Sequence, residues 1–226
     1  FKTVILSLPV LYLRFTLFNL RRVLMIKSLI IKIIILCLVS IKASAIEKIV
    51  LFGDSLMAGY GLSKEQHLSK VLQEKLILDG YNIEVINGSV SGSTSAGGLN
   101  RADWTLAESN IDLIILGLGA NDMLRGINPT ETKVNLEKII NIAKNKNIKV
   151  ILAGMIAPIT HGREYKKNFD QIYPYLSEKY ELQLIPFLLE GVALKPEFNL
   201  SDGMHPNAKG TIIISNTLKD LILKNL

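Results

Sequence analysis

Short runs of apolar and β-branched residues alternate along the chain with longer segments in which apolar residues recur at helical spacing. Alternation of this kind is typical of βαβ units, in which helices cover both faces of a parallel sheet. The pattern therefore predicts an α/β fold, a three-layer α/β/α sandwich on a mostly parallel sheet. We expect five strands, over residues 48–52, 83–87, 112–118, 149–153 and 183–185.

Helix signals separate these strands. One helix face is indicated by apolar residues at helical spacing, namely Leu68, Val71, Leu72 and Leu76. Another helix is expected to begin at Asn128, which can cap it, followed by Pro129 with the fixed φ of a first turn. Its apolar face should continue through Val134 and Ile139. A last helix is expected from about residue 207 to residue 223.

Charge is distributed unevenly along the chain. The formal net charge is +6, yet residues 1–45 carry seven basic side chains and no acidic one, which leaves 19 basic and 20 acidic residues in the remainder. The basic character therefore belongs to the N-terminal segment and gives no argument for a nucleic-acid partner. With 49% hydrophobic and 20% charged residues, the composition describes a folded protein and excludes a disordered one.

Residues 25–45 resemble a secretory signal peptide. Lys27 and Lys32 precede an uncharged apolar run over residues 33–41. As a helix this run would rise only about 14 Å, much less than the ~30 Å hydrocarbon layer of a membrane. An A-x-A pattern ends at Ala45 and predicts cleavage there. We therefore expect an exported protein, either periplasmic or secreted.

The remainder of the N-terminal segment leaves an alternative open. A second apolar run over residues 4–13 would also suit an uncleaved membrane anchor. Because the chain begins with Phe1, we expect residues 1–24 to lie upstream of the true start at Met25. In either case, residues 46–226 should form one folded domain, because they contain no repeat, linker or abrupt change in composition.

Polar residues suited to acyl transfer occur in the loops expected beyond the carboxyl ends of strands, where ligands bind in an open α/β sheet. Ser55 directly follows the first strand, and Gly53 permits a tight turn. A serine hydroxyl needs a base at neutral pH, which His205 could supply. Asp202, three residues earlier, could orient the imidazole and stabilise its cation. Taken alone, each of these residues could equally well be a helix cap, a turn residue or a surface side chain.

Two further residues could stabilise an oxyanion. Asn121 follows the third expected strand, and Gly92 has a bare backbone whose N–H can approach a substrate closely. Taken singly, Asn121 would more often cap a helix and Gly92 serve a turn. An α/β-hydrolase elbow of the form G-x-S-x-G is absent, because Met57 occupies the place of its second glycine.

Four segments, taken jointly and in order, carry a family resemblance: L-F-G-D-S-L-M-A-G-Y-G at 51–61, V-I-N-G-S-V-S-G-S-T-S at 85–95, G-A-N-D-M-L-R-G at 119–126 and S-D-G-M-H-P-N at 201–207. They resemble the SGNH (GDSL) hydrolases, specifically the thioesterase I, lysophospholipase L1 and arylesterase group of secreted bacterial enzymes. The resemblance spans essentially all of residues 46–226. It implies a flavodoxin-like sheet and neither a metal nor an organic cofactor.

The resemblance also implies the roles of individual residues. These are Ser55 as nucleophile, His205 as base and then acid, Asp202 as its orienter, and the Ser55 N–H, Gly92 and Asn121 as oxyanion donors. Met123 stands where a glycine is familiar in the family, and its bulk would narrow the acyl pocket. We expect the substrate to be bound by Met123, Leu124, Ala157 and Pro158.

The sequence therefore predicts an exported serine esterase that hydrolyses acyl esters through an acyl-enzyme intermediate. The expected substrates are lysophospholipids, aryl esters or thioesters, and the expected partners are small molecules, with transient contact at a membrane surface and a monomeric state. Because acyl-CoA is cytosolic, lipid and aryl esters suit an exported enzyme better. A carbohydrate O-deacetylase is the alternative, with a smaller and more polar pocket. A catalytically silent binding module is a third reading.

Overall fold

The computed structural model describes residues 18, 22, 24–28 and 46–224. The apolar run and the cleavage site of the predicted signal peptide, within residues 33–45, lie outside the described residues. No helix in the described part of the chain is long and apolar enough to cross a membrane. All the described strands lie within residues 46–224.

The strands form one sheet in the order β2-β1-β3-β4-β5, and every neighbouring pair is parallel. Their bounds are β1 Lys48–Gly53, β2 Glu84–Asn87, β3 Leu113–Gly117, β4 Lys149–Ala153 and β5 Gln183–Ile185. This strand order is that of flavodoxin-like doubly wound sheets. The predicted fold class is confirmed, and the sheet is wholly rather than mostly parallel.

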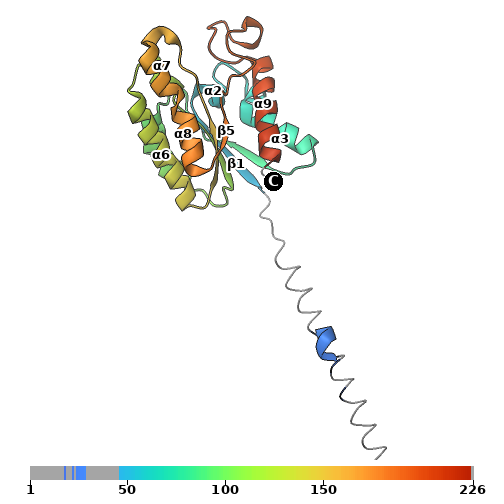
Figure 1. Cartoon of the computed structure of the whole chain (residues 1–226). Coiled ribbons are helices and arrows are strands. Elements are labelled where there is room, and N and C mark those ends of the chain that lie inside the picture. The colour runs from blue at the N-terminus through green and yellow to red at the C-terminus, as the bar shows by residue number, and fades with distance from the viewer. Residues whose placement is uncertain (1–17, 19–21, 23, 29–45, 225–226) are drawn as a thin grey trace, which may run out of the picture. The chain divides into compact units, whose positions relative to one another are not determined.

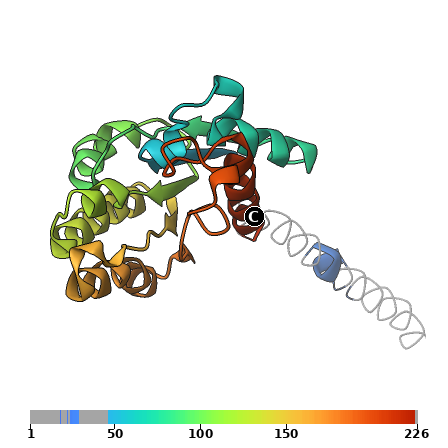
Figure 2. The same ribbon diagram turned by 90° about the horizontal axis from the view of Figure 1, so that it is seen from above.

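Helices cover both faces of the sheet (Figures 1 and 2). The α-helices are α2 Ser55–Ala58, α3 Leu68–Leu78, α4 Ser95–Thr105, α5 Ala120–Leu124, α6 Pro129–Asn145, α7 Arg163–Asp170, α8 Ile172–Tyr180 and α9 Ala208–Leu223, with short 3₁₀ helices η1 Lys64–Gln66, η2 Ile159–His161 and η3 Pro196–Phe198. Helices α3 and α9 pack against each other on one face, and α4, α6 and α8 form the other layer.

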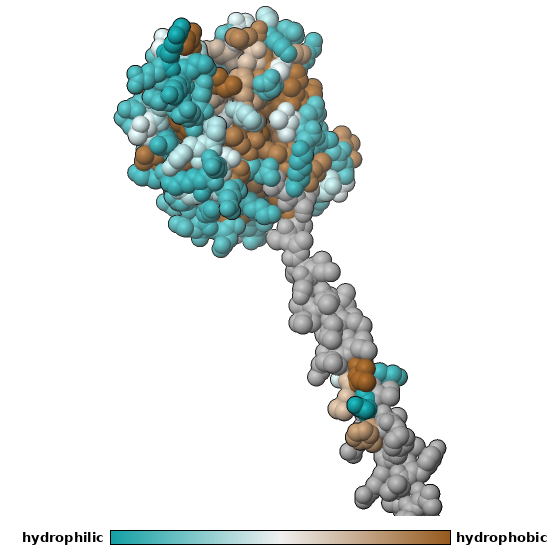
Figure 3. All heavy atoms as spheres, viewed as in Figure 1, coloured by the Kyte–Doolittle hydropathy of each residue, from teal (hydrophilic) through white to brown (hydrophobic). Residues whose placement is uncertain are grey.

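The core lies along the central strands. All five residues of β3 are buried, as are the last five residues of β1, because helices shield both faces of a parallel sheet. Three of the helices present polar outer surfaces: in Figure 3, hydrophilic side chains cover α6, α7 and α8, whereas hydrophobic ones show between α8 and α9. The buried strands therefore give the loops at their carboxyl ends a rigid base.

Helix α6 shows one error in the predicted pattern. Asn128 caps it as expected, since its side chain accepts a hydrogen bond of 2.9 Å from a backbone N–H of the first turn. Ile139 is buried, but Val134 is exposed, so its place on the apolar face was wrongly predicted. Thr132 takes the inward position instead, because its hydroxyl donates a hydrogen bond to the buried carboxylate of Asp122.

Candidate active site

Ser55 is the first residue of α2, a one-turn helix that directly follows β1. The side chain of Asp54 caps this turn, accepting a 3.0 Å hydrogen bond from a backbone N–H. Met57 is fully buried over Gly53 and Gly117, the last residues of β1 and β3. A Cβ at either glycine would lie within 2.7 Å of the Met57 side chain. Glycines at both strand ends therefore let Met57 anchor the turn that carries Ser55.

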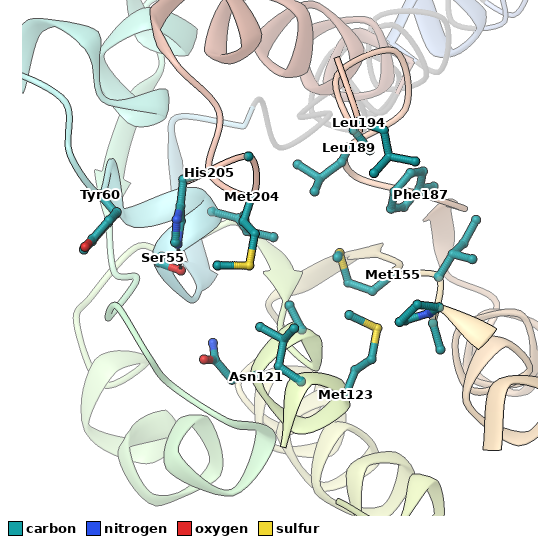
Figure 4. Close-up of a pocket in the computed structure, with 18 of the residues that line it drawn as sticks. Ser55, Tyr60, Asn121, Met123, Met155, Phe187, Leu189, Leu194, Met204 and His205 are labelled. Atoms are coloured by element: carbon teal, nitrogen blue, oxygen red, sulfur yellow. Dashed lines mark hydrogen bonds between the residues drawn. The ribbon is translucent and has the colours of Figure 1, made fainter. Parts of the chain in front are cut away.

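The structure brings Ser55, His205 and Asp202 together (Figure 4 shows the first two). His205 Nε2 lies 2.9 Å from Ser55 Oγ, and His205 Nδ1 lies 2.7 Å from Asp202 Oδ2. The other Asp202 oxygen accepts hydrogen bonds from the backbone N–H groups of His205 (3.0 Å) and Met204 (2.9 Å). These backbone bonds, with that from the imidazole, lower the pKa of Asp202 to about 2. Asp202 is therefore ionised at neutral pH and faces the imidazole as a carboxylate.

The loop that carries Asp202 and His205 is clamped at its base. It lies between η3 and α9 and does not directly follow a strand, contrary to expectation, since β5 ends at Ile185. Asn199 forms an isolated antiparallel bridge with Pro206, and the backbone N–H of Leu200 donates to His205 O (2.8 Å). This closure holds His205 over Ser55 without support from the sheet.

Asn121 and Gly92 lie in the same cavity as Ser55. Asn121 belongs to α5, just beyond β3, and its Nδ2 donates long hydrogen bonds to Ser93 O (3.2 Å) and Asp54 Oδ2 (3.3 Å). Gly92 has a φ of +77°, in the left-handed region that favours glycine. Both predicted donors thus stand beside the serine, and a substrate oxyanion would compete for the weakly bound Asn121 amide.

Asp54 lies beneath these groups. Its carboxylate is buried, and burial raises its pKa to about 6, against the opposing effect of hydrogen bonds from the Leu56 N–H and the Asn121 amide. One Asp54 oxygen caps the Ser55 turn and the other holds Asn121. Asp54 therefore couples the position of the serine to that of the amide.

A second buried carboxylate fixes α5. Asp122 is fully buried and accepts hydrogen bonds from the Ser95 N–H (2.7 Å), the Ser95 hydroxyl and the Thr132 hydroxyl (3.1 Å). Ser95 Oγ accepts a further bond from Asn135. The network ties α5 to α4 and α6, and so holds Asn121 in place from below.

A cavity of about 740 Å³ extends from Ser55. All four residues expected to bind substrate line it, namely Met123, Leu124, Ala157 and Pro158. No Lys, Arg, Asp or Glu is among the described residues that line it, and most of the lining is apolar. The described residues also contain no group of three or more His, Cys, Asp and Glu that could hold a metal ion.

Several lining residues were not predicted from the sequence: Tyr60, Met155, Phe187, Leu189, Leu194 and Met204 (Figure 4). Tyr60 and Met204 stand inside two of the motifs quoted above. The segment after β5 carries three of the others, because its strand ends at the same edge of the sheet. Ligands bind beyond the carboxyl ends of the strands in an open α/β sheet, so the loop after β5 could also have been predicted to line the site.

Comparisons with known proteins agree with this geometry. Residues 51–211 match the model of the GDSL-like Lipase/Acylhydrolase family. An arylesterase of Vibrio mimicus is 37% identical over 194 residues, which cover 86% of this chain and 96% of the relative. The thioesterase 1/protease 1/lysophospholipase L1 of Escherichia coli K12 is 36% identical over 172 residues, covering 76% and 81% of the two chains.

A solved structure shares the fold. The psychrotrophic esterase EstA from Pseudoalteromonas sp., inhibited by monoethylphosphonate, superposes with a TM-score of 0.75 at 32% identity, covering 79% of this chain and 97% of that one. The family match spans well over half of the chain, and the relatives match over most of their own length. The chain therefore belongs to the GDSL-like lipase/acylhydrolase family and is related to arylesterase and thioesterase I.

Proposed function

We propose that the protein is an exported, monomeric serine esterase that acts on acyl esters of medium or long chain length. The observation that carries this proposal is the continuous chain of contacts from Ser55 Oγ to His205 Nε2 (2.9 Å) and from His205 Nδ1 to Asp202 (2.7 Å). A hydroxyl, an imidazole and an ionised carboxylate in this order constitute an activated nucleophile with its base and orienter.

The proposed mechanism has two halves that use the same groups. His205 removes the proton of the Ser55 hydroxyl while Oγ attacks the ester carbonyl, and the resulting oxyanion accepts hydrogen bonds from Asn121 and from the N–H groups of Ser55 and Gly92. The tetrahedral intermediate expels the alcohol, which takes the proton from His205. Water, deprotonated by His205, then attacks the acyl-enzyme, and Ser55 leaves with the proton as the carboxylic acid is released.

The cavity supports a lipid or aryl ester over an acetylated sugar. Its volume of about 740 Å³ and its apolar lining suit an acyl chain of many carbons, whose burial contributes about 0.8 kcal/mol per methylene. An O-deacetylase would need less room and more polar groups. The names of the relatives, arylesterase and lysophospholipase among them, agree with this preference. Export would remove the enzyme from cytosolic acyl-CoA, so we place lysophospholipids and aryl esters ahead of thioesters.

A substrate panel tests the proposed function. Turnover of p-nitrophenyl esters from acetate to palmitate is compared with that of a lysophospholipid and of acetylated xylan, with Ser55→Ala as the control. We expect kcat/KM to rise from acetate to medium or long chains, and Ser55→Ala to be inactive. A preference for acetylated xylan would favour the deacetylase, and turnover of no ester would favour a binding module.

Covalent labelling tests the nucleophile separately. EstA is inhibited by monoethylphosphonate, and we expect an ethylphosphonate reagent to add one phosphonyl group to this protein, on the peptide that contains Ser55. Ser55→Ala should not be labelled. Labelling of another serine would refute the assignment even if the enzyme hydrolysed esters.

Export is tested on residues 25–226. Expression from Met25 in a bacterial host, followed by fractionation and N-terminal sequencing, should give a mature protein that begins at Ile46. A membrane-bound product that retains residues 25–45 would support an uncleaved anchor instead.

A further inference from the structure

The aromatic ring of Tyr60 lies against the imidazole of His205 (Figure 4). The ring centroids are 4.4 Å apart and the planes are tilted by 35°. Tyr60 is 51% exposed, whereas the His205 side chain is only 16% exposed. Tyr60 therefore covers one face of the proposed general base, and its own outer face is open to solvent.

The turn that carries Ser55 also places Tyr60. Helix α2 ends at Ala58, and its C-cap residue Gly59 has a φ of +85°, in the left-handed region. A Cβ at Gly59 would lie 2.3 Å from the ring of His67, so both the backbone conformation and the available space require glycine. The chain reverses at Gly59, and the next residue, Tyr60, lies beside His205. The nucleophile and the aromatic ring thus come from one short segment.

Stacking of this kind acts differently on the two forms of His205. A cation within about 6 Å of an aromatic ring is attracted to its π face, whereas neutral imidazole has no net charge to be attracted. His205 becomes an imidazolium each time it takes the proton of Ser55 or of water. Two other ionisable groups interact with His205. Asp202 lies 2.7 Å from its Nδ1, and the buried Asp54 interacts with it electrostatically. Tyr60 is thus positioned to add to the stabilisation that Asp202 gives to the charged form.

We propose that Tyr60 is a positioning residue that keeps the His205 ring in its reactive orientation and stabilises the imidazolium by stacking against it. The inference rests on the proposed function, because only a His205 that takes up a proton benefits from it. Nothing in the family resemblance assigns a role to Tyr60.

The first test needs no turnover. The titration of the His205 ring is followed by NMR in the unmodified protein and in Tyr60→Leu, Tyr60→Met and Tyr60→Phe. The chain has only three histidines, so a His205→Gln variant assigns the signal. We expect the midpoint to move to lower pH by about 0.7 to 1.5 units in the Leu and Met variants, and to stay in place in Tyr60→Phe, which keeps the ring.

Tyr81 provides the matched control. It is 39% exposed and lies outside the cavity, so Tyr81→Leu removes a surface tyrosine without touching His205. Its His205 titration should equal that of the unmodified protein. Circular dichroism verifies that each variant is folded, and Tyr60→Met replaces Tyr60→Leu if the latter does not fold.

Kinetics give the second readout. We expect kcat in Tyr60→Leu to fall about fivefold to thirtyfold with little change in KM, and the acidic limb of kcat/KM to move to lower pH with the NMR midpoint. Tyr60→Phe should restore both. An unmoved midpoint in a folded Tyr60→Leu or Tyr60→Met, or a Tyr60→Phe variant that behaves like them, would overturn the inference. If the midpoint moves but the unmodified protein hydrolyses no ester, the proposed function fails and the stacking stands.

Discussion

The two halves of the proposed active site are built in different ways. Ser55 and Asn121, which we call the strand half, lie in the short helices just beyond the buried strands β1 and β3. Asp202 and His205, which we call the loop half, lie on a surface loop between η3 and α9. The core therefore sets the positions of the proposed nucleophile and of one proposed oxyanion donor, whereas the position of the imidazole depends on local hydrogen bonds where its loop begins and ends.

The carboxylates of the two halves show what this difference means energetically. Asp122, next to Asn121, is fully buried and satisfied by hydroxyl and amide donors, so its loss would leave buried partners unpaired. The Asp202 side chain is 32% exposed and takes its donors from its own loop. We infer that substitutions in the strand half affect both stability and activity, and that those in the loop half affect activity far more than stability.

The largest expected effect comes from removing the reacting atoms in either half. Ser55→Ala and His205→Ala should each lower kcat by about 10⁴ to 10⁶, because neither half can activate the nucleophile alone. The double variant should lose little more than either single one. Saturation kinetics on the best p-nitrophenyl ester measure this. Losses that differ greatly between the halves, or that multiply in the double variant, would show that the two halves do not act together.

Asp202→Asn isolates the loop half. An amide can still accept the backbone N–H bonds of Met204 and His205 through its oxygen, but it cannot stabilise the imidazolium or fix its tautomer. We expect kcat to fall by about 10⁴ while Tm changes little. Kinetics and thermal unfolding of the same preparation measure the two quantities. A large drop in Tm would contradict the view that this loop contributes little to the stability of the fold.

Asn121→Ala is the corresponding change in the strand half. Loss of one oxyanion donor should lower kcat by about 10² to 10³. The side chain also bonds Ser93 O and Asp54 Oδ2, so we expect the free energy of unfolding to fall by roughly 1 kcal/mol as well. Urea unfolding measures this second effect. An Asn121→Ala variant with full stability would remove the predicted contrast with Asp202→Asn.

The sequence predicted more of the fold than of the contacts between distant segments. The strands were predictable because buried parallel strands are continuous apolar runs, and the proximity of Ser55 and His205 was expected because both stand in ordered motifs. Val134 was misplaced, since a buried carboxylate drew Thr132 inward, and no local pattern reports such a pairing. Tyr60 was missed because its partner, His205, is distant in sequence. A contact of this kind, between residues far apart in the sequence, is recognised only once the fold is known.

Asp54 links the Ser55 turn to Asn121 within the strand half, and its replacement gives the smallest expected effect. Burial raises its pKa to about 6 from an ordinary value near 4, so between these values the folded state holds a proton that the unfolded state has lost. Stability from this group is therefore present at low pH and is lost as pH rises through about 6.

Asp54→Asn removes the titration while leaving an uncharged side chain of the same shape. The amide of the variant is a weaker hydrogen-bond acceptor for Asn121 than the carboxylate. This loss of stability is the same at every pH, so it cancels when the pH dependence of the unfolding free energy is compared. From pH 5 to pH 8, the unmodified protein should lose about 1 kcal/mol of unfolding free energy relative to Asp54→Asn. Urea unfolding at both pH values measures the difference. If the unfolding free energies of the two proteins change equally between pH 5 and pH 8, then Asp54 is already ionised at pH 5. That result would mean that water reaches the Asp54 carboxylate.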